Sequence, residues 1–385
     1  MSTKVRLTTV CAVLALAAAT GCSSSTTTKT SQNAGVSKKA DAALAAIQGK
    51  VLSKGPHGET PAPMEAATLT GAEISKVKAL GATAAIVMHY GGNDWATAQI
   101  AGLKSEFGKL GIKVVAVTDA NFKPDKQVSD LETVLAKKPD IIVSIPTDPV
   151  ATASAYKAAA KTGAKLVFMD NVPEGMTAGK DYVSVVSADN YGNGVTSAHM
   201  MAKALGGKGT IGLIHHEADF FVTKQRYEGF KATIAKDYPK IKIVDDKGIA
   251  GPDFAGDAQK AADAMLTEHA NLDGIWAVWD VPAEGVMAAA RSAGRTDLLI
   301  ATEDLGTNVA IALAKKQLVV GLGAQRPFDQ GITEARLGAG SLIGKKAPAY
   351  VALSALPVEH DNVLQAWKQV YHADPPSDLS KSFKK

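Results

Sequence analysis

Acidic, amide and aromatic side chains gather at a few short stretches of this 385-residue chain. Asp170 and Asn171 follow one apolar run, and Glu303 and Asp304 follow another. An ionised carboxylate accepts two hydroxyl hydrogen bonds at once, which suits the adjacent hydroxyl groups of a polyol. Trp95 follows a third run, and its flat indole offers a surface for the C–H face of a sugar. These residue types indicate a site for a small hydroxylated molecule.

Other residues at the ends of apolar runs have two readings that the sequence leaves open. Asp94 and Asp280 each precede a helix-like stretch, so each can cap a helix or contact a ligand. Trp276 and Trp279 differ in strand parity, which predicts Trp276 in the core and Trp279 in a cleft. Arg226 lies in the first turns of a helix-like stretch, where its guanidinium group reaches a cleft or pairs with a surface acid.

Motifs for catalysis or metal binding are not evident. His215 and His216 precede two carboxylates, but adjacent residues of an extended chain point to opposite sides, and no third ligand cluster accompanies them. The adjacent acids Glu303 and Asp304 are splayed apart for the same reason, which argues against paired acid and base catalysts. No serine elbow, phosphate-binding glycine loop or zinc-ligand spacing is found. We therefore expect no enzyme activity, no cofactor and no metal.

The elements that must position these residues occur twice along the chain. Four short apolar runs, each followed by a helix-like stretch, recur in the same order roughly 127 to 133 residues later. Continuous β-branched runs are typical of strands buried on both faces of a parallel sheet, and ligands bind beyond the carboxyl ends of such strands. This pattern predicts an α/β fold with two Rossmann-like lobes and a cleft. The runs are residues 83–89, 114–118, 141–146 and 165–169, then 210–215, 241–244, 274–279 and 298–302.

The N-terminus indicates the compartment. Two basic residues precede the apolar stretch Leu7–Ala19, which ends in small residues before Cys22. An apolar stretch this short indicates a signal peptide rather than a membrane span. The site resembles the lipobox of bacterial lipoproteins, so residues 1–21 are predicted to be removed and Cys22 to carry a lipid; an ordinary secretory peptide is the alternative. The Ser/Thr-rich residues 22–36 would then form a disordered tether outside the cytoplasmic membrane, in the periplasm or on the extracellular face.

The remaining composition describes a globular protein. Apolar residues make up 46% and charged residues 21% of the chain, and the net charge of +4 is spread without a basic block, so nucleic acid is not an expected partner. No further apolar run is long enough to span a membrane. Residues 37–82 are predicted to form a helical N-terminal extension, in which Thr70–Glu73 has the pattern of a capping box.

Four longer motifs resemble those of type I periplasmic binding proteins, most closely the ribose-binding branch of bacterial sugar importers. The motifs are Ile145–Asp148, Ser187–Asn190, Arg226–Phe230 and Ala324–Gly331, and the resemblance extends over about residues 83–355. It implies a lobe 1 of residues 83–188 and 326–353 and a lobe 2 of residues 189–325 and 354–385. Three crossovers, near Asp189, Gln325 and Ser354, would form the hinge. Family members trap a monosaccharide between their lobes and deliver it to a membrane permease driven by an ATPase.

The resemblance also implies ligand contacts. Seven positions keep the chemical type of the family's site, namely Asn93, Trp95, Asp170, Arg226, Phe254, Asp304 and Gln325. Four positions depart from it: Ile145 and Trp279 replace asparagines, Asn171 replaces an arginine, and Glu303 replaces an aromatic residue. Such changes move specificity, so another pentose, a tetritol or a pentitol is expected rather than D-ribose. The full set of predicted ligand contacts is Asn93, Asp94, Trp95, Asp170, Asn171, Phe220, Arg226, Phe254, Trp279, Asp280, Glu303, Asp304 and Gln325.

The resemblance therefore implies a solute-binding lipoprotein that delivers a small sugar or polyol to an ABC transporter permease, and a monomer is expected. A sensory receptor, which would present a sugar or a furanose-like signal to a membrane kinase or chemoreceptor, is the main alternative. Repressors of the lactose-repressor family share the fold but need an N-terminal helix-turn-helix, and here the signal peptide stands in that place. A hydrolase is the third class, which incubation with glycosides would test.

Overall fold

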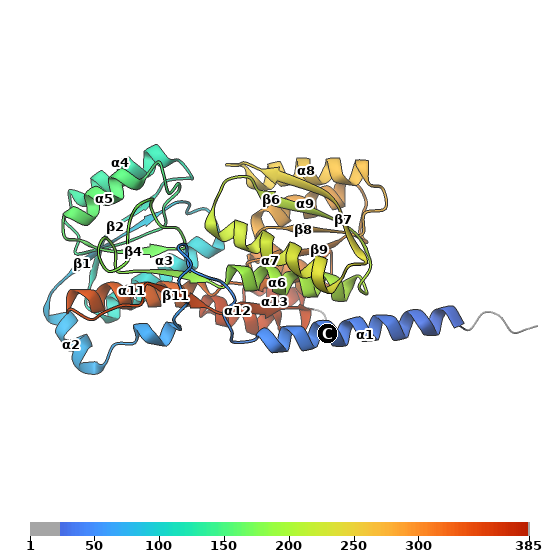
Figure 1. Ribbon diagram of the computed structural model, residues 1–385, viewed down its shortest axis with the longest axis horizontal. Helices are drawn as coiled ribbons and strands as arrows, with labels where there is room; N and C mark the ends of the chain where they lie inside the picture. Colours follow the sequence, from blue (N-terminus) through green and yellow to red (C-terminus); the bar gives the residue numbers. More distant parts are fainter. Residues whose placement is uncertain (1–23, 384–385) are drawn as a thin grey trace, which may run out of the picture.

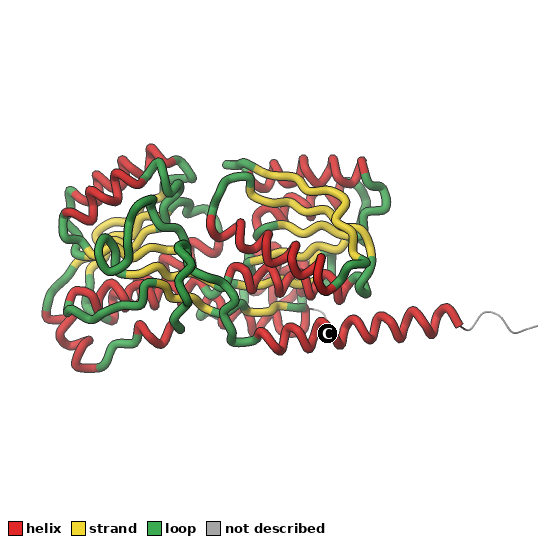
Figure 2. The backbone as a smooth tube through the Cα atoms, viewed as in Figure 1, coloured by secondary structure: helices red, strands yellow, loops and turns green. Residues whose placement is uncertain are grey.

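Two α/β lobes lie side by side in the computed structural model, which describes residues 24–383, with side chains from residue 33 onward (Figure 1). Each lobe has a central sheet with helices on both faces (Figure 2). The predicted fold class is confirmed. The predicted signal peptide and Cys22 lie outside the described residues.

The sheet of lobe 1 has six parallel strands in the order β11-β5-β4-β3-β1-β2. Its inner strands are buried along almost their whole length, which explains their continuous apolar runs, whereas the edge strand β2 is partly exposed. The strands are β1 (Thr83–Met88), β2 (Lys113–Asp119), β3 (Ile141–Ser144), β4 (Lys165–Met169), β5 (Ser184–Ala188) and β11 (Tyr350–Leu353).

The sheet of lobe 2 repeats this design in the order β12-β10-β9-β8-β6-β7. Five strands are parallel, and the short β12 runs antiparallel to β10 at the edge. The strands are β6 (Gly209–His216), β7 (Ile241–Ile249), β8 (Gly274–Ala277), β9 (Leu299–Glu303), β10 (Val319–Ala324) and β12 (Leu356–Val358).

Helices cover both sheets, and close packing between helices fixes the position of those that reach the cleft. A Cβ atom at Gly194 would lie 2.0 Å from the carbonyl oxygen of Arg226, so α6 and α7 touch backbone to backbone. This contact holds Arg226 in the first turns of α7, beside the first crossover. The helices of lobe 1 are α3 (Asp94–Lys109), α4 (Pro124–Leu135), α5 (Ala153–Lys161) and α11 (Pro327–Leu342). Those of lobe 2 are α6 (Asn190–Ala204), α7 (Phe221–Asp237), α8 (Phe254–Glu268), α9 (Asp280–Ser292), α10 (Thr307–Ala314), α12 (Val363–Tyr371) and α13 (Ser377–Ser382).

The chain passes between the two sheets three times, after β5, β10 and β11. The first crossing begins at Asp189, whose buried carboxylate accepts hydrogen bonds from the backbone N–H groups of Leu52, Ser53 and Gly192. The segment before lobe 1 therefore lies against the hinge and is bonded to it.

The N-terminal extension consists of α1 (Ser24–Ile47), the 3-10 helix η1 (Met64–Ala67) and α2 (Gly71–Ala79). The predicted capping box is confirmed, because Thr70 accepts a hydrogen bond from the backbone of Glu73 while Glu73 accepts one from the backbone of Thr70. Ala62 pairs with Val351 and so continues the sheet of lobe 1 beyond β11. Among the described residues, no helix has the length and apolar character that a membrane crossing requires.

The disordered conformation predicted for residues 22–36 is wrong from Ser24 onward, where α1 begins. The C-terminal half of α1 packs on α6, with Ala40 and Leu44 buried and Asp41 paired with Lys203 at 2.8 Å. Once packing has nucleated a helix, adding further turns costs little, so the helix continues into the Ser/Thr-rich residues.

Candidate ligand-binding site

A narrow cavity of about 70 Å³ lies between the lobes, at the carboxyl ends of both sheets. Nine of the thirteen predicted ligand contacts line it, and both lobes contribute. From lobe 1 come Asn93, Trp95 and Asp170. From lobe 2 and the second crossover come Phe220, Arg226, Phe254, Trp279, Asp304 and Gln325.

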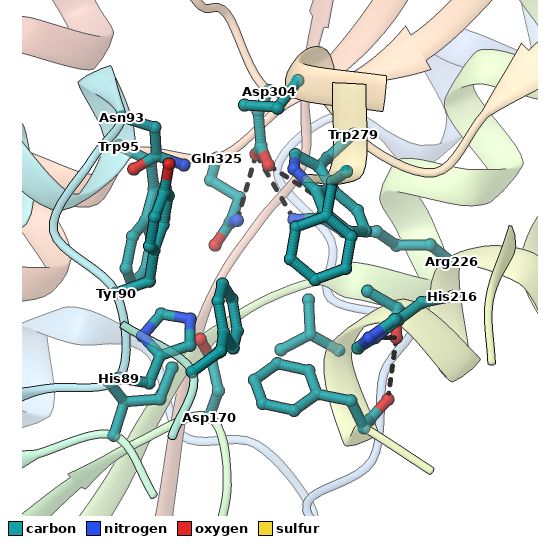
Figure 3. Close-up of a pocket in the computed structure, with 17 residues that line it drawn as sticks. His89, Tyr90, Asn93, Trp95, Asp170, His216, Arg226, Trp279, Asp304 and Gln325 are labelled. Atoms are coloured by element: carbon teal, nitrogen blue, oxygen red, sulfur yellow. Dashed lines mark hydrogen bonds and ion pairs between the residues drawn. The ribbon is translucent and has the colours of Figure 1, made fainter. Parts of the chain in front are cut away.

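An ion pair forms the polar wall of the cavity in lobe 2. Arg226 is 2% exposed and donates to both carboxylate oxygens of Asp304, at 3.0 and 3.3 Å. Gln325 donates to the same carboxylate at 3.0 Å (Figure 3). A two-pronged arginine contact fixes the carboxylate in one orientation, and its remaining lone pairs can accept hydroxyl groups. The surface pairing considered for Arg226 is thereby excluded.

A chain of hydrogen bonds connects this wall to the carboxylate of lobe 1. Arg226 Nε donates to Asn190 Oδ1 at 3.2 Å, Asn190 Nδ2 donates to Ser187 Oγ at 3.0 Å, and Ser187 Oγ donates to Asp170. Ser187 lies in β5 and Asn190 begins α6, so the two residues flank the first crossover. The two acidic groups of the cavity are therefore linked through the hinge itself.

Asp170 and Asp304 occupy equivalent positions, one residue after β4 and one residue after β9. Both adopt left-handed backbone conformations, with φ of 55° and 65°. Non-glycine residues rarely adopt this conformation, and it is concentrated at functional sites. Burial raises the pKa of Asp170 to about 6, against the opposing effects of the Ser187 hydrogen bond and the Arg226 charge.

Aromatic rings form much of the remaining wall. Trp95 and Tyr90 stand on one side of the cavity and Trp279 and His216 on the other (Figure 3). Burial lowers the pKa of His216 to about 4, so its imidazole is neutral at pH 7. Neutral rings and indoles suit the C–H surface of a ring or a carbon chain.

Three buried polar atoms of the cavity residues have no hydrogen-bond partner among the described residues: His89 Nδ1, Trp95 Nε1 and Gln325 Oε1. A buried polar group without a partner is costly, and such groups are normally satisfied by water or a ligand. These atoms support the interpretation of the cavity as a binding site.

Four predicted contacts do not line the cavity. Asp94 reaches across to lobe 2 and accepts hydrogen bonds from the backbone N–H and hydroxyl of Thr307, both at 2.7 Å. Asn171 is 1% exposed and donates to the carbonyl of Pro146 at 3.1 Å. Both side chains are thus engaged with protein groups.

Asp280 and Glu303 are turned away by local geometry. Asp280 begins α9 and accepts from the N–H of Val281 at 2.9 Å, and burial raises its pKa well above the usual range. Glu303 is the last residue of β9 and points to the face opposite Asp304, where Ser197 and Trp276 donate to it at 2.6 and 3.1 Å. Strand alternation is the cause, because successive side chains face opposite sides.

The sequence reasoning missed several aromatic and aliphatic lining residues. His89 and Tyr90 directly follow β1, so the same rule of strand ends could have found them. Phe122 follows β2 by three residues, a position without a polar signal. The lining residues outside the predicted set of contacts are His89, Tyr90, Phe122, Ile145, His216, Val222, Thr223 and Val281. Of these, Ile145 was named from the sequence only as a departure from the family's site.

The ring of His216 packs against Phe254 and Trp279 at centroid distances of 5.4 and 5.8 Å. Across the described part of the chain, the one group of possible metal ligands is Asp245, Glu268 and His269. It lies outside the cavity, and Lys247 already pairs with both of its carboxylates.

Comparisons with known proteins agree with this geometry. The family described as periplasmic binding protein domain matches residues 84–346, more than half of the chain. The ribose import binding protein of Bacillus subtilis is 29% identical over 248 residues, which cover 64% of this chain and 76% of that protein. The D-apiose import binding protein of Paraburkholderia graminis is 26% identical over 54% of this chain and 63% of its own length.

Solved structures show the same fold. An ABC sugar transporter subunit from Rhodobacter sphaeroides superposes with a TM-score of 0.64 at 26% identity, covering 73% of this chain and 99% of that one. A solute-binding protein from Agrobacterium vitis, solved with α-D-tagatopyranose, gives a TM-score of 0.69 at 23% identity, covering 75% and 99%. The chain therefore belongs to the periplasmic binding protein family, whose members are extracytoplasmic solute-binding proteins of transport systems.

Proposed function

We propose that this protein captures a small sugar or polyol, of the pentose, tetritol or pentitol class, and delivers it to the permease of an ABC importer. One observation carries the proposal: the carboxylates of Asp170 and Asp304, one from each lobe, face a single cavity that also contains the indoles of Trp95 and Trp279. Carboxylates that accept hydroxyl hydrogen bonds and indoles that cover C–H faces are complementary to a carbohydrate. The sugar-importer relatives support the same class.

The charges of the cavity favour a neutral ligand. Arg226 is the one cationic side chain among the lining residues, and Asp304 already neutralises it. A carboxylate or phosphate on the ligand would meet the second acid, Asp170, without a free cation to offset the repulsion.

Closure of the lobes follows from the same contacts. A ligand that bonds to both Asp170 and Asp304 stabilises the arrangement in which the lobes approach one another, and the population shifts toward it. The permease would then recognise the closed pair of lobes, as a hinge motion about the three crossovers brings them together.

A thermal-shift screen tests this function. We would use the chain carrying Cys22→Ser, which cannot be lipidated, and compare pentoses, hexoses, tetritols, pentitols and amino acids. A ligand at a hundred times its dissociation constant stabilises a protein by about 2.7 kcal/mol, which is a shift of several degrees. Stabilisation by a sugar or polyol is expected. Stabilisation by amino acids alone would contradict the proposal.

We also propose that Cys22 carries the lipid anchor that holds the protein at the outer face of the cytoplasmic membrane. The lipobox-like site before this cysteine supports the proposal. Metabolic labelling with a fatty acid should mark the wild-type protein, whereas Cys22→Ser should be unlabelled and leave the membrane fraction. An unlabelled wild-type protein would indicate an ordinary secretory signal.

A further inference from the structure

The polar and the apolar side chains of the cavity lie on different sides of it, according to the position in the sheet of the strand that each follows. Asp170, Asp304 and Gln325 follow β4, β9 and β10, which lie on the hinge side of the two sheets. Arg226 joins them through its ion pair with Asp304. We call this side the hinge half of the cavity. It holds every charged side chain among the lining residues.

The strands farther from the hinge contribute rings. In lobe 1, β1 and the edge strand β2 are followed by His89 and Phe122. In lobe 2, β8 and the edge strand β7 are followed by Trp279 and Phe254. Phe122 and Phe254 meet across the lobes at a centroid distance of 5.2 Å. We call this side the outer half of the cavity.

Few polar atoms are available in the outer half. His216 Nδ1 lies 3.4 Å from the Thr223 hydroxyl, and the Tyr90 hydroxyl, which lies beside Gly92, is the one phenol among the lining residues. Two buried nitrogens of the outer half have no partner among the described residues, His89 Nδ1 and Trp95 Nε1. The ring of His89 packs against Phe122 and Phe220 at centroid distances of 4.7 and 5.8 Å. Burial lowers the pKa of His89 to about 3, so the ring is neutral.

Aliphatic side chains extend this apolar surface. Ile145 follows β3, and Val281 stands two residues beyond Trp279 at the start of α9. Neither side chain can accept or donate a hydrogen bond. A ligand hydroxyl pointing at them would lose its water without gaining a partner, whereas a methyl group there would be favourably buried.

We infer that the solute carries its hydroxyl groups at one end and a methyl or other unhydroxylated carbon at the other, as in a deoxy sugar or a deoxy alditol. The hydroxylated end binds Asp170, Asp304 and Gln325, and the unhydroxylated end contacts the rings of the outer half. This inference rests on the proposed function and narrows its ligand class.

Matched sugar pairs test the inference. Isothermal titration of the Cys22→Ser chain would compare D-ribose with 5-deoxy-D-ribose, D-galactose with D-fucose, and L-mannose with L-rhamnose. In every pair that binds, the deoxy member should bind at least tenfold more tightly, which corresponds to about 1.4 kcal/mol. A parent sugar that binds as tightly as its deoxy form, or more tightly, would overturn the inference and leave the proposed function standing. A chain that binds none of these six and nothing in the wider carbohydrate screen would overturn both.

A nearly isosteric variant locates the unhydroxylated end. Val281→Thr adds a hydroxyl to the outer half without adding volume, and should reduce the preference for the deoxy member at least threefold. Val117→Thr makes the same change on β2 at an exposed position outside the cavity and should leave the preference unchanged. An undiminished preference in Val281→Thr would overturn the assigned orientation.

Discussion

Asp94 offers a way to separate lobe closure from ligand contact. Its carboxylate accepts two hydrogen bonds from Thr307, at the first turn of α10 in the opposite lobe, and it does not line the cavity. A carboxylate at a helix N-terminus satisfies free N–H groups and interacts favourably with the helix dipole. Asp94→Ala should therefore weaken ligand binding by making the closed arrangement less stable.

The size of this effect follows from the contact. A hydrogen bond to an ionised group contributes about 1.5–3 kcal/mol, and because Asp94 is only partly buried we expect the lower end of this range. About 1.5 kcal/mol corresponds to roughly a tenfold change in the ratio of closed to open molecules. The apparent dissociation constant rises by at most the same factor, since the site itself is unchanged.

A matched control exists within lobe 1. Asp140 accepts hydrogen bonds from the backbone N–H and hydroxyl of Thr83 at 2.7 and 3.0 Å, so it forms the same carboxylate–threonine pair without joining the lobes. Asp140→Ala should lower the thermal midpoint and leave ligand affinity unchanged.

Titration calorimetry and small-angle scattering of the ligand-free protein would measure the two quantities. For Asp94→Ala we expect roughly tenfold weaker binding and a larger radius of gyration. Equal affinity losses in Asp94→Ala and Asp140→Ala would refute the reasoning. A loss above about a hundredfold in Asp94→Ala would also refute it, because a direct ligand contact would then be needed.

Three further substitutions address the charged groups. Arg226→Ala removes the cation paired with the carboxylate of Asp304, and urea unfolding should show a loss of about 3 kcal/mol, the lower end for breaking a buried ion pair. A loss below about 1 kcal/mol would contradict this. Glu303→Gln tests whether the protonation of Glu303 is coupled to folding. Burial raises the pKa of Glu303 from 4.5 to about 8. Between these pH values the folded state keeps a proton that the unfolded state releases, so the stability of the wild-type protein falls as the pH rises. The variant should show a shallower fall in thermal midpoint across that range, and an unchanged slope would exclude Glu303 as the source. Asp170 has a pKa of about 6, so ligand affinity should fall as the pH drops through 6. Asp170→Asn should bind the ligand about ten- to a hundredfold more weakly and without that pH dependence. An affinity within threefold of wild type would exclude Asp170 as an anchor.

Local patterns predicted most of the fold. The apolar runs correspond to the buried inner strands, because a strand covered on both faces must be apolar along its length. The capping box at Thr70 also depends on neighbouring residues alone. The conformation of residues 24–36 could not be predicted in this way, since α1 is held by its packing on α6, far along the chain.

The site was likewise predicted in part, where local sequence position was sufficient. Asp170 and Asp304 were found because they stand at the carboxyl ends of parallel strands, where ligands bind. Glu303 was placed with Asp304 by its position in the sequence, but its side chain faces Ser197 and Trp276 on the other side of the sheet. The position of a strand end was therefore predictable, whereas the direction of each side chain required the exact strand boundary.

The sequence by itself determined the two repeated α/β units, the strand ends that carry the acids, and the chemical character of a site for hydroxyl groups and C–H faces. Only the tertiary structure decided that Asp94 joins the lobes rather than the ligand, and that His89 and Phe122 of one lobe meet Phe220 and Phe254 of the other. Periodicity and capping act over a few residues, so they are readable along the chain. Contacts across the cleft join residues more than a hundred positions apart, and they form only when two finished lobes are brought together by the hinge.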